Sequence, residues 1–397
     1  MKKLLSIGII ATLAITATAC SSNETPADTA TSTETEGSTD STSDSQSTDE
    51  AADVELYKVG MTTDSGTIDD KSFNQGTWEG IKRYEEEFGT IESRYVQPAG
   101  EAEQDYLDAY ANLVDLGYKT IFSPGYKFET AVYKAQELYP DVNFVILDGY
   151  PHSGDYAADI ASNTESIFFA EQESGFYAGV ASAMSTNTGK VGFIGGSEIP
   201  AVQKFGWGYV AGIAYANENF GTDVSVSEYI YQGTFTDIAA GKSLAGQFYD
   251  NGCDIIFAAA GGVGVGVIDE GKTRRSNSED VWVVGVDVDQ YESGKMADGS
   301  SVILTSAMKD LNAASYNALD EILNGTFKGS EMITLDTSNG GVGLPEENPN
   351  LSEEALAKYE EVYASVLAGD IVVPSTVEDL EAFLSEHGYT TPSGVVY

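Results

Sequence analysis

The chain has 397 residues, of which 63 are acidic and 20 basic, so its formal net charge is −43. This charge argues against nucleic acid or an anionic surface as the main partner, because binding to phosphate groups requires clustered Lys and Arg. The two cysteines, Cys20 and Cys253, and the two histidines, His152 and His387, form no cluster with metal-ligand spacing. We therefore predict no metal, no cofactor and no histidine-based catalysis.

The N-terminus has the pattern of a secretory signal peptide. Two lysines precede an apolar stretch over residues 4–15, and small residues follow up to Cys20. The apolar stretch is too short to span a membrane. The sequence before Cys20 resembles a lipoprotein cleavage motif, although Ala17 stands where that motif usually has Leu. We predict a signal peptide over residues 1–19 and a lipidated Cys20 that anchors the chain to the extracytoplasmic face of the cell membrane. The alternative is plain secretion after cleavage.

An acidic, low-complexity segment follows over residues 20–53. It is rich in Ser, Thr, Asp, Glu and Ala and contains no aromatic residue, Lys or Arg. Such a segment cannot bury enough apolar surface to fold, and its like charges extend it. We predict a disordered tether. Since Cys20 would carry a lipid, Cys253 has no partner for a disulfide, and we expect it to be buried beside an apolar strand.

Beyond residue 54, apolar β-prone runs alternate with helical patterns. The clearest runs cover residues 119–124, 143–149, 190–196, 253–260, 281–287 and 301–308. This alternation indicates an α/β fold, in which helices cover both faces of parallel sheets. The segment is too long for one such core, so we predict two doubly wound α/β lobes. A further helix is predicted over residues 352–367, with Ser352 as its cap.

The segment over residues 64–80, DSGTIDDKSFNQGTWEG, carries the strongest functional signal. It follows a short apolar strand at residues 56–61, and Asp64 and Ser65 lie in a run of turn-forming residues. From Phe73 onward, apolar residues recur every three to four positions, which predicts a helix. Open α/β sheets bind ligands at such strand ends, and a carboxylate beside an aromatic ring suits a flat polar molecule. The alternative is that Phe73 belongs to the core and the aspartates cap the helix.

This string is very similar to the opening motif of the basic membrane lipoproteins, which are the purine-nucleoside-receptor type of ABC-transporter substrate-binding protein. Further segments resemble family motifs in the same order. They are NTESIFFAEQESGFYAGVASA from Asn163, VGFIGGSEIPAVQKFGWGYVAG from Val191, AAAGGVGVGV from Ala258, VVGVDVDQ from Val283 and LTSAMKD from Leu304. The resemblance extends over most of residues 57–325.

The resemblance implies a type I periplasmic-binding-protein fold, in which the chain crosses between two lobes three times and the ligand lies in the cleft between them. We place the crossings near residues 160–163, 304–307 and 325–330. The first lobe would then hold residues 54–161 and 306–325, and the second residues 162–305 and 326–397.

The resemblance also implies the site residues. The positions that contact a base in the family correspond to Asp64, Ser65 and Asp148. Those that contact a ribose correspond to Gly261, Asp287 and Lys309. Phe73 would stack on the base, and either Phe205 or Phe257 would cover its opposite face. A carboxylate such as Asp287 can accept hydrogen bonds from both ribose hydroxyls while Lys309 offsets its charge; a structural ion pair at the hinge is the alternative.

The implied function is that of a cell-surface lipoprotein, not an enzyme, that captures purine nucleosides and delivers them to the permease of an ABC importer. The same fold could hold a pyrimidine nucleoside, a base, a sugar or an autoinducer instead. A nucleoside-processing enzyme and a surface adhesin or signalling receptor also stay open.

One tempting motif is set aside. Residues 266–273, GVIDEGKT, fit the letters of a phosphate-binding loop. A true loop follows its strand at once, whereas here the strand is expected to end near Ala260 and a helix to cover the motif. We expect Gly262, Gly264 and Gly266 to allow a close approach of the backbone to a ligand.

Overall fold

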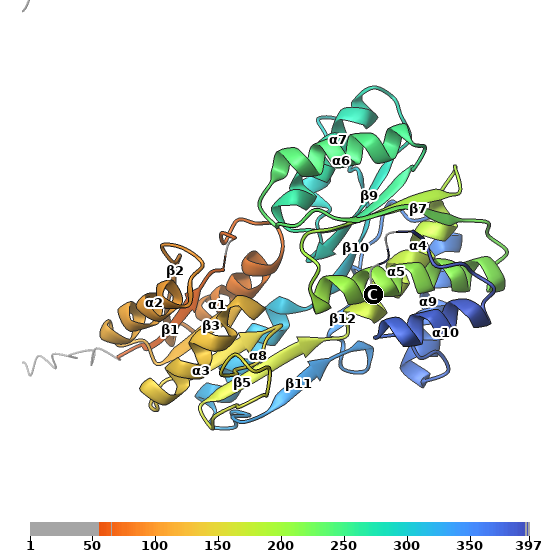
Figure 1. The fold of residues 1–397 in the computed structure, drawn as a ribbon. Coiled ribbons are helices and arrows are strands. Elements are labelled where there is room, and N and C mark those ends of the chain that lie inside the picture. Colours follow the sequence, from red (N-terminus) through yellow and green to blue (C-terminus); the bar gives the residue numbers. More distant parts are fainter. Residues whose placement is uncertain (1–54, 65, 394, 396–397) are drawn as a thin grey trace, which may run out of the picture. The chain divides into compact units, whose positions relative to one another are not determined.

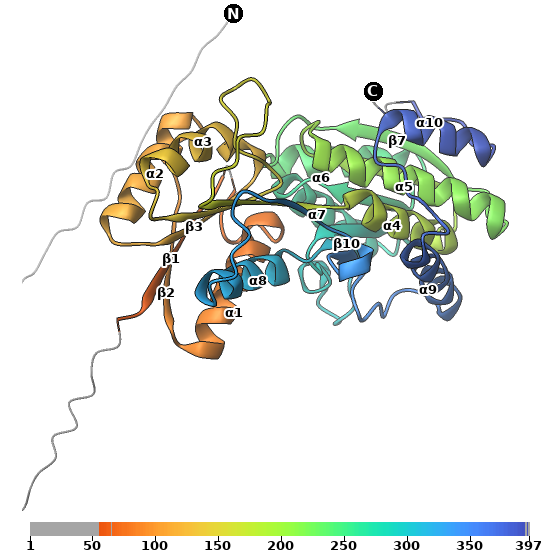
Figure 2. The ribbon, with the colours of Figure 1, turned by 90° about the horizontal axis from the view of Figure 1, so that it is seen from below.

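The structure is a computed structural model, and it describes residues 55–64, 66–393 and 395. The predicted signal peptide, Cys20, the acidic tether and Ser65 lie outside these residues. The part of the chain that follows the tether forms one compact unit. It contains two six-stranded sheets, each with helices on both faces, as Figures 1 and 2 show. The predicted α/β architecture of two lobes is confirmed.

The first sheet is parallel throughout and has the order β11-β5-β4-β3-β1-β2. Its strands are β1 (Tyr57–Thr62), β2 (Ile91–Val96), β3 (Thr120–Pro124), β4 (Asn143–Leu147), β5 (Thr164–Phe169) and β11 (Met332–Leu335). Its helices are α1 (Phe73–Phe88) and α8 (Leu311–Leu323) on one face, and α2 (Glu103–Asp115) and α3 (Glu129–Leu138) on the other. Because side chains alternate along a strand, Ile121 packs toward α2 and α3 while Phe122 packs toward α1 and α8.

The second sheet has the order β12-β10-β9-β8-β6-β7, and only β12 is antiparallel to its neighbour. Its strands are β6 (Lys190–Gly195), β7 (Ser225–Tyr231), β8 (Ile255–Ala259), β9 (Trp282–Asp287), β10 (Ile303–Lys309) and β12 (Val342–Gly343). One face carries α4 (Glu171–Ser185), α5 (Pro200–Asn219), α9 (Glu353–Ala368) and α10 (Val377–Glu386), and the other carries α6 (Ile238–Asp250) and α7 (Gly262–Ser276). The helix predicted over residues 352–367 is therefore confirmed as α9, and Ser352 caps it.

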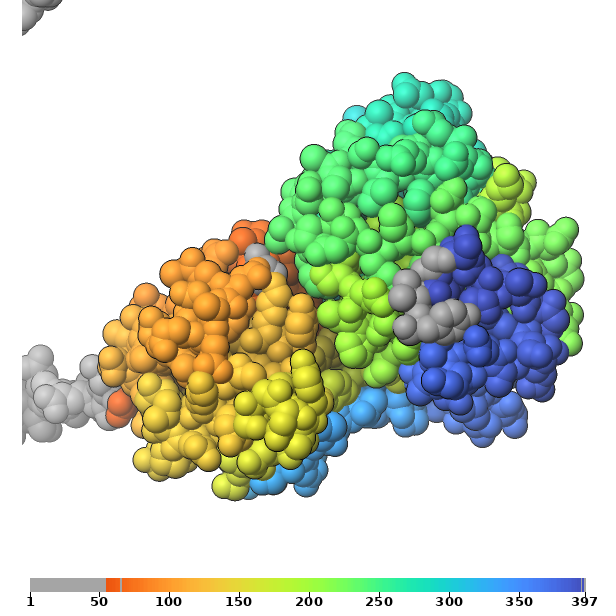
Figure 3. All heavy atoms as spheres, in the orientation of Figure 1, coloured from red at the N-terminus to blue at the C-terminus, as the bar shows by residue number. Residues whose placement is uncertain are grey.

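The chain crosses between the sheets at other places than predicted. It leaves the first sheet after β5, returns to it after β10 and leaves it again after β11. Residues 164–169 and 332–335 thus belong to the first sheet, and residues 306–309 to the second. The predicted boundaries were wrong there because the segments that lead into the crossings are themselves strands. In Figure 3 the blue C-terminal helices, α9 and α10, lie beside the green part of the chain, in agreement with their packing on α4 and α5.

Three short 3₁₀ helices interrupt the loops, at Tyr126–Phe128, Glu292–Gly294 and Thr337–Asn339. The described part of the chain contains no helix that is both long and apolar enough to cross a membrane. Cys253 is buried as predicted, beside the start of β8, and burial raises the pKa of its thiol.

Glycines near the start of α7 allow this helix to pack closely on α6. A side chain at Gly266 would meet the backbone of Ile238 in α6 at 2.0 Å, and one at Gly241 of α6 would meet the backbone of Val263 at 2.0 Å. The two helices therefore approach closely through reciprocal glycines. Gly266 therefore serves the packing of the two helices, and the helical GVIDEGKT segment does not form a phosphate-binding loop.

Candidate functional site

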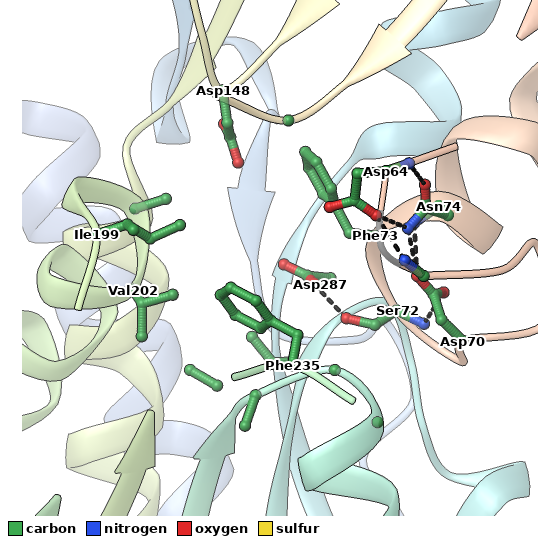
Figure 4. Close-up of a pocket in the computed structure, with 18 of the residues that line it drawn as sticks. Asp64, Asp70, Ser72, Phe73, Asn74, Asp148, Ile199, Val202, Phe235 and Asp287 are labelled. Atoms are coloured by element: carbon green, nitrogen blue, oxygen red, sulfur yellow. Dashed lines mark hydrogen bonds between the residues drawn. The ribbon is translucent and has the colours of Figure 1, made fainter. Parts of the chain in front are cut away.

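A cavity lies between the two sheets, where the carboxyl ends of β1 and β4 meet those of β8, β9 and β10. Its empty space is about 700 Å³, including the part that opens to solvent. This size lies within the roughly 300–1,000 Å³ of small-molecule sites in proteins. Parallel strands bring their polar end residues to one edge of each sheet, so both lobes contribute side chains to the cavity, as Figure 4 shows.

Most of the predicted site residues line this cavity. They are Asp64, Phe73, Asp148, Phe205, Gly261, Asp287 and Lys309. Phe257 does not line it. Its side chain is fully buried on the face of the second sheet that α4 and α5 cover, and its ring meets that of Phe205 edge-on at 5.9 Å between centroids. Of the two aromatic residues left open by the sequence, Phe205 is therefore the one at the cavity.

A hydrogen-bond network holds the loop that follows β1. Asp70 caps α1, because its carboxylate accepts hydrogen bonds from the backbone N–H groups of Ser72, Asn74 and Gln75. The Asn74 amide donates to Asp70 Oδ2 at 2.9 Å and to Asp64 Oδ1 at 2.8 Å. One oxygen of Asp64 is thus fixed within its own loop. Burial raises the pKa of Asp64, and it raises the pKa of Asp70 to about 6.

Asp148 and Asp287 occupy equivalent positions in the two lobes. Asp148 follows β4 and Asp287 ends β9, and both have a left-handed backbone, with φ of 52° and 65°. Aspartate tolerates this conformation better than most residues, and such strain is typical of functional positions. The left-handed turn ends each strand and leaves its carboxylate beside the cavity.

Lys309 lies fully buried among three carboxylates. Its ammonium group donates a hydrogen bond to Asp148 and lies 3.6 Å from both Glu171 Oε1 and Asp287 Oδ1. Burial alone would lower the pKa of Lys309, but the charges of Asp148, Asp287 and Glu171 outweigh it and raise the pKa, so Lys309 is charged. Burial also raises the pKa of Asp287, and with the charge of Asp148 it raises that of Glu171 to about 7.

Aromatic rings surround the same ammonium group. It lies 4.5 Å from the ring centroid of Phe73 and 5.6 Å from that of Phe205, which are cation–π distances. Phe235, in the loop between β7 and α6, adds a ring from the second lobe. The ring packs directly on Gly196, because a Cβ at that position would lie only 2.3 Å from it. In Figure 4 the rings of Phe73 and Phe235 both border the cavity.

Sequence reasoning did not identify Ser72, Asn74, Glu171 and Phe235. Asn74 stands one residue after Phe73 within the motif, so its place in the first turn of α1 was a usable signal. Glu171 lies in the first turn of α4 within another quoted motif, yet nothing in its surroundings marked it as buried. Phe235 follows a polar loop and resembles any other exposed aromatic residue. Within the described residues, no group of His, Cys, Asp and Glu side chains has metal-binding geometry.

Two α/β lobes with a cavity at their strand ends are an architecture that the chain shares with solved solute-binding proteins. A solute-binding protein of an ABC transporter from Aeropyrum pernix K1 superposes with a TM-score of 0.71 at 23% identity, covering 84% of this chain and 97% of that one. A second, from Conexibacter woesei, superposes with a TM-score of 0.62 at 21% identity, covering 81% of this chain and 99% of that one. The fold is the type I periplasmic-binding-protein fold.

The chain belongs to the family of PnrA-like ABC transporter substrate-binding proteins, whose model matches residues 57–377. It is 34% identical over 327 residues to the ABC transporter nucleoside-binding protein BmpA of Lactococcus lactis, covering 80% of this chain and 89% of that protein. It is 35% identical to a CD4+ T-cell-stimulating antigen of Listeria monocytogenes, covering 80% and 88%. It is 33% identical to basic membrane protein A of Borreliella burgdorferi, covering 84% and 92%.

Proposed function

We propose that this protein captures purine nucleosides in the cavity between its lobes and delivers them to the permease of an ABC importer. The observation that carries the proposal is the combination of aromatic rings with Lys309 and its carboxylates at one cavity. A nucleoside presents the matching groups, because its base offers a π face and its ribose offers vicinal hydroxyls. The nucleoside-binding relative from Lactococcus lactis supports this ligand class.

The charges of the cavity favour a neutral ligand that is rich in hydrogen-bond donors. The described residues that line it include four aspartates, Asp64, Asp70, Asp148 and Asp287, but only one basic side chain, Lys309. Carboxylates accept hydrogen bonds from N–H and O–H groups and repel phosphate in a poorly solvated site. Nucleosides should therefore bind in preference to nucleotides.

The two lobes divide the ligand between them in this proposal. Asp64 and Asp148 of the first lobe would accept from the base edge, and Phe73 would stack on one face of the base. Asp287 and Lys309 of the second lobe would hold the ribose. Ser65 is assigned to the base on the resemblance alone, and Gly261, which lines the cavity, is assigned to the ribose.

Transport requires the protein to stay near its permease, and the N-terminus supplies a means. Lipidation of Cys20 would anchor the chain on the extracytoplasmic face of the membrane, and the acidic tether would hold the lobes away from it. The name of the Borreliella burgdorferi relative, basic membrane protein A, supports this location. Mass spectrometry of the purified membrane fraction tests it. A diacylated N-terminal peptide that starts at Cys20 is expected, and an unmodified one would contradict lipidation.

No chemical step is part of the proposal. A nucleoside-processing enzyme needs a nucleophile or a general base poised beside its substrate. The buried carboxylates at this cavity are engaged with Lys309, Ser72 or Asn74 instead. Prolonged incubation with nucleosides followed by chromatography should return them unchanged.

The direct test is calorimetry on protein that has been unfolded and refolded to remove any bound ligand. We expect adenosine, guanosine or inosine to bind more tightly than cytidine and uridine, and ribose and nucleoside 5′-monophosphates to bind weakly. A preference for pyrimidines, free bases or sugars would assign the same fold to another ligand. Lack of binding by every nucleoside would overturn the proposal.

A further inference from the structure

The segment that follows β9 makes direct contacts with the first lobe. The side-chain amide Nε2 of Gln290 donates a hydrogen bond to the backbone carbonyl of Lys71 at 2.6 Å. Next to it, Val288 packs so closely on α1 that a Cβ at Gly76 would lie 2.9 Å from its Cγ1. Gln290 is not among the residues that line the cavity. The contact therefore joins the lobes beside the ligand site without forming part of it.

Gln290 is also hydrogen-bonded to two strands of its own lobe, β9 and β10. It is buried, with 2% of its surface exposed. Its Oε1 accepts a hydrogen bond from the backbone N–H of Val286 at 3.3 Å, and its own backbone N–H donates to Ser306 Oγ at 3.1 Å. Val286 directly precedes Asp287, so the Gln290 side chain supports the end of β9 from which that carboxylate projects.

The first lobe presents two adjacent groups to this segment. Lys71 has a left-handed backbone, with φ of 59°, which places its carbonyl against Gln290. The next residue, Ser72, donates its hydroxyl hydrogen to Asp287 Oδ2, as the dashed line in Figure 4 marks. Two consecutive residues of one lobe therefore bind Asp287 and Gln290 of the other. We call these two hydrogen bonds the latch.

We propose that Gln290 is a positioning residue that couples closure of the lobes to the grip of Asp287 on the ligand. This inference rests on the proposed function, in which Asp287 binds the ribose. When the lobes separate, Lys71 moves away from Gln290, and Asp287 loses the hydrogen bond from Ser72. When they close, Gln290 fixes the backbone before Asp287 while Ser72 orients its carboxylate. Gln290 thereby slows release of the ligand without touching it.

The test compares Gln290→Leu with a matched substitution, Gln136→Leu. Gln136 is also a buried glutamine, with 3% of its surface exposed, and it bridges two backbone groups. Its Nε2 donates to the carbonyl of Asp159 at 2.8 Å, and its Oε1 accepts from the N–H of Ala161 at 3.0 Å. All of these groups lie within the first lobe. The two variants thus lose similar hydrogen bonds, but only one loses a bond between lobes.

Two measurements distinguish loss of the latch from a general loss of stability. The first is the distance between spin labels at Leu138→Cys on α3 and Leu367→Cys on α9, two exposed positions in different lobes, measured without ligand. The second is the release rate of a purine nucleoside in stopped flow. We expect Gln290→Leu to lengthen the mean distance and to speed release about five- to tenfold, as for the loss of one buried hydrogen bond. Gln290→Glu, which cannot donate to the Lys71 carbonyl, should do the same.

Gln136→Leu should lower the melting temperature and leave both readouts unchanged. Gly76→Ala places a methyl group against Val288 of the second lobe and against Leu311 of its own lobe, so it should lengthen the distance even if the Gln290 variants fold poorly. Unchanged distances in the Gln290 and Gly76 variants would overturn the proposal, as would equal effects of Gln290→Leu and Gln136→Leu on release. Failure of the wild type to bind nucleosides would instead count against the proposed function, because the distance measurement needs no ligand.

Discussion

Lys309, at the end of β10 in the second lobe, donates a hydrogen bond to the carboxylate of Asp148, which follows β4 in the first lobe. The pair joins the two lobes at the cavity, and Asp287 and Glu171 lie close to the same ammonium group. A ligand in the cavity therefore meets side chains that already interact with one another across the cleft. This arrangement makes Lys309 the central charge of the site.

Replacing Lys309 by Met should remove measurable nucleoside binding and destabilise the fold. Three buried carboxylates would lose their counter-charge, and breaking such a buried pair typically costs about 3–5 kcal/mol. Calorimetry and thermal unfolding measure the two effects. Lys328→Met is the control, because Lys328 pairs with Glu321 away from the cavity and 41% of its side chain is exposed. Undiminished binding by Lys309→Met would contradict its role.

Replacing Phe73 by Ala should weaken binding by about 1–3 kcal/mol, the usual contribution of stacking on one face of a base. Phe73→Tyr should retain most of the affinity, since its ring can still stack. The matched control is Phe88→Ala at the other end of the same helix, where 47% of the residue is exposed. Equal affinities of Phe73→Ala and Phe88→Ala would rule out stacking on Phe73.

Substitutions of two aromatic residues in the second lobe should have opposite effects on nucleoside affinity and on stability. Phe235→Ala is expected to weaken nucleoside binding with little loss of stability, because its ring borders the cavity. Phe257→Ala should instead destabilise the protein by about 3–5 kcal/mol, as for other buried aromatic residues, and leave the affinity of the folded protein nearly unchanged. Denaturant unfolding measures the stabilities, and calorimetry measures the affinities. Weak nucleoside binding by folded Phe257→Ala, with normal binding by Phe235→Ala, would instead indicate that Phe257 stacks on the base.

Stability should fall as the pH rises from about 4.5 to about 7. Glu165 is buried in β5, and burial raises its pKa from 4.5 to about 7. Between these two values the folded state binds more protons than the unfolded state, so the free energy of unfolding decreases with pH. The effect of this one group is at most about 3 kcal/mol.

Glu165→Gln isolates this contribution. The amide has no charge to desolvate, so the variant should melt at a higher temperature than the wild type near pH 8 and show a shallower dependence on pH. Glu381→Gln, at an exposed position of α10, is the control. A melting temperature of Glu165→Gln that follows that of the wild type at every pH would contradict a raised pKa in the folded protein.

Added salt should stabilise the protein. Most of the formal net charge of −43 lies in residues 55–397, where it repels itself more strongly in the compact state than in the unfolded chain. Raising the ionic strength to about 1 M shortens the Debye length to roughly 3 Å and screens this repulsion. The melting temperature should therefore rise from low salt to about 1 M NaCl. A constant or falling value would show that the acidic groups are too dispersed to matter.

Much of the fold could be predicted because the central strands, such as β3, β4, β8 and β9, are short, apolar and almost entirely buried. The crossings were predicted a few residues too early, because only the pairing of β5 with β4 and β11 shows that these strands belong to the first sheet. The places of Asp64, Asp287 and Lys309 at the cavity were predictable because they stand at strand ends within the quoted motifs, and that of Asp148 because it follows an apolar strand.

The remaining parts of the site depend on where side chains point and which residues meet in the folded chain, and the sequence contains neither. Phe205 and Phe257 pack against each other in the same core, so the choice between them depends on which ring reaches the cavity, and that distance is not contained in the sequence. Gln290 was missed for another reason. Its importance arises from a carbonyl 219 positions earlier in the chain, at Lys71, which is adjacent only after both lobes have folded and closed.

The most direct test of the central claim is a pair of calorimetric titrations. Ligand-free wild-type protein and its Asp287→Ala variant are titrated with the same purine nucleoside, after circular dichroism has shown that both are folded. The proposed function predicts tight, saturable binding by the wild type and a loss of about a hundredfold or more in the variant, as for a charged hydrogen-bond acceptor at a buried site. Equally tight binding by both proteins, or none by either, would contradict it.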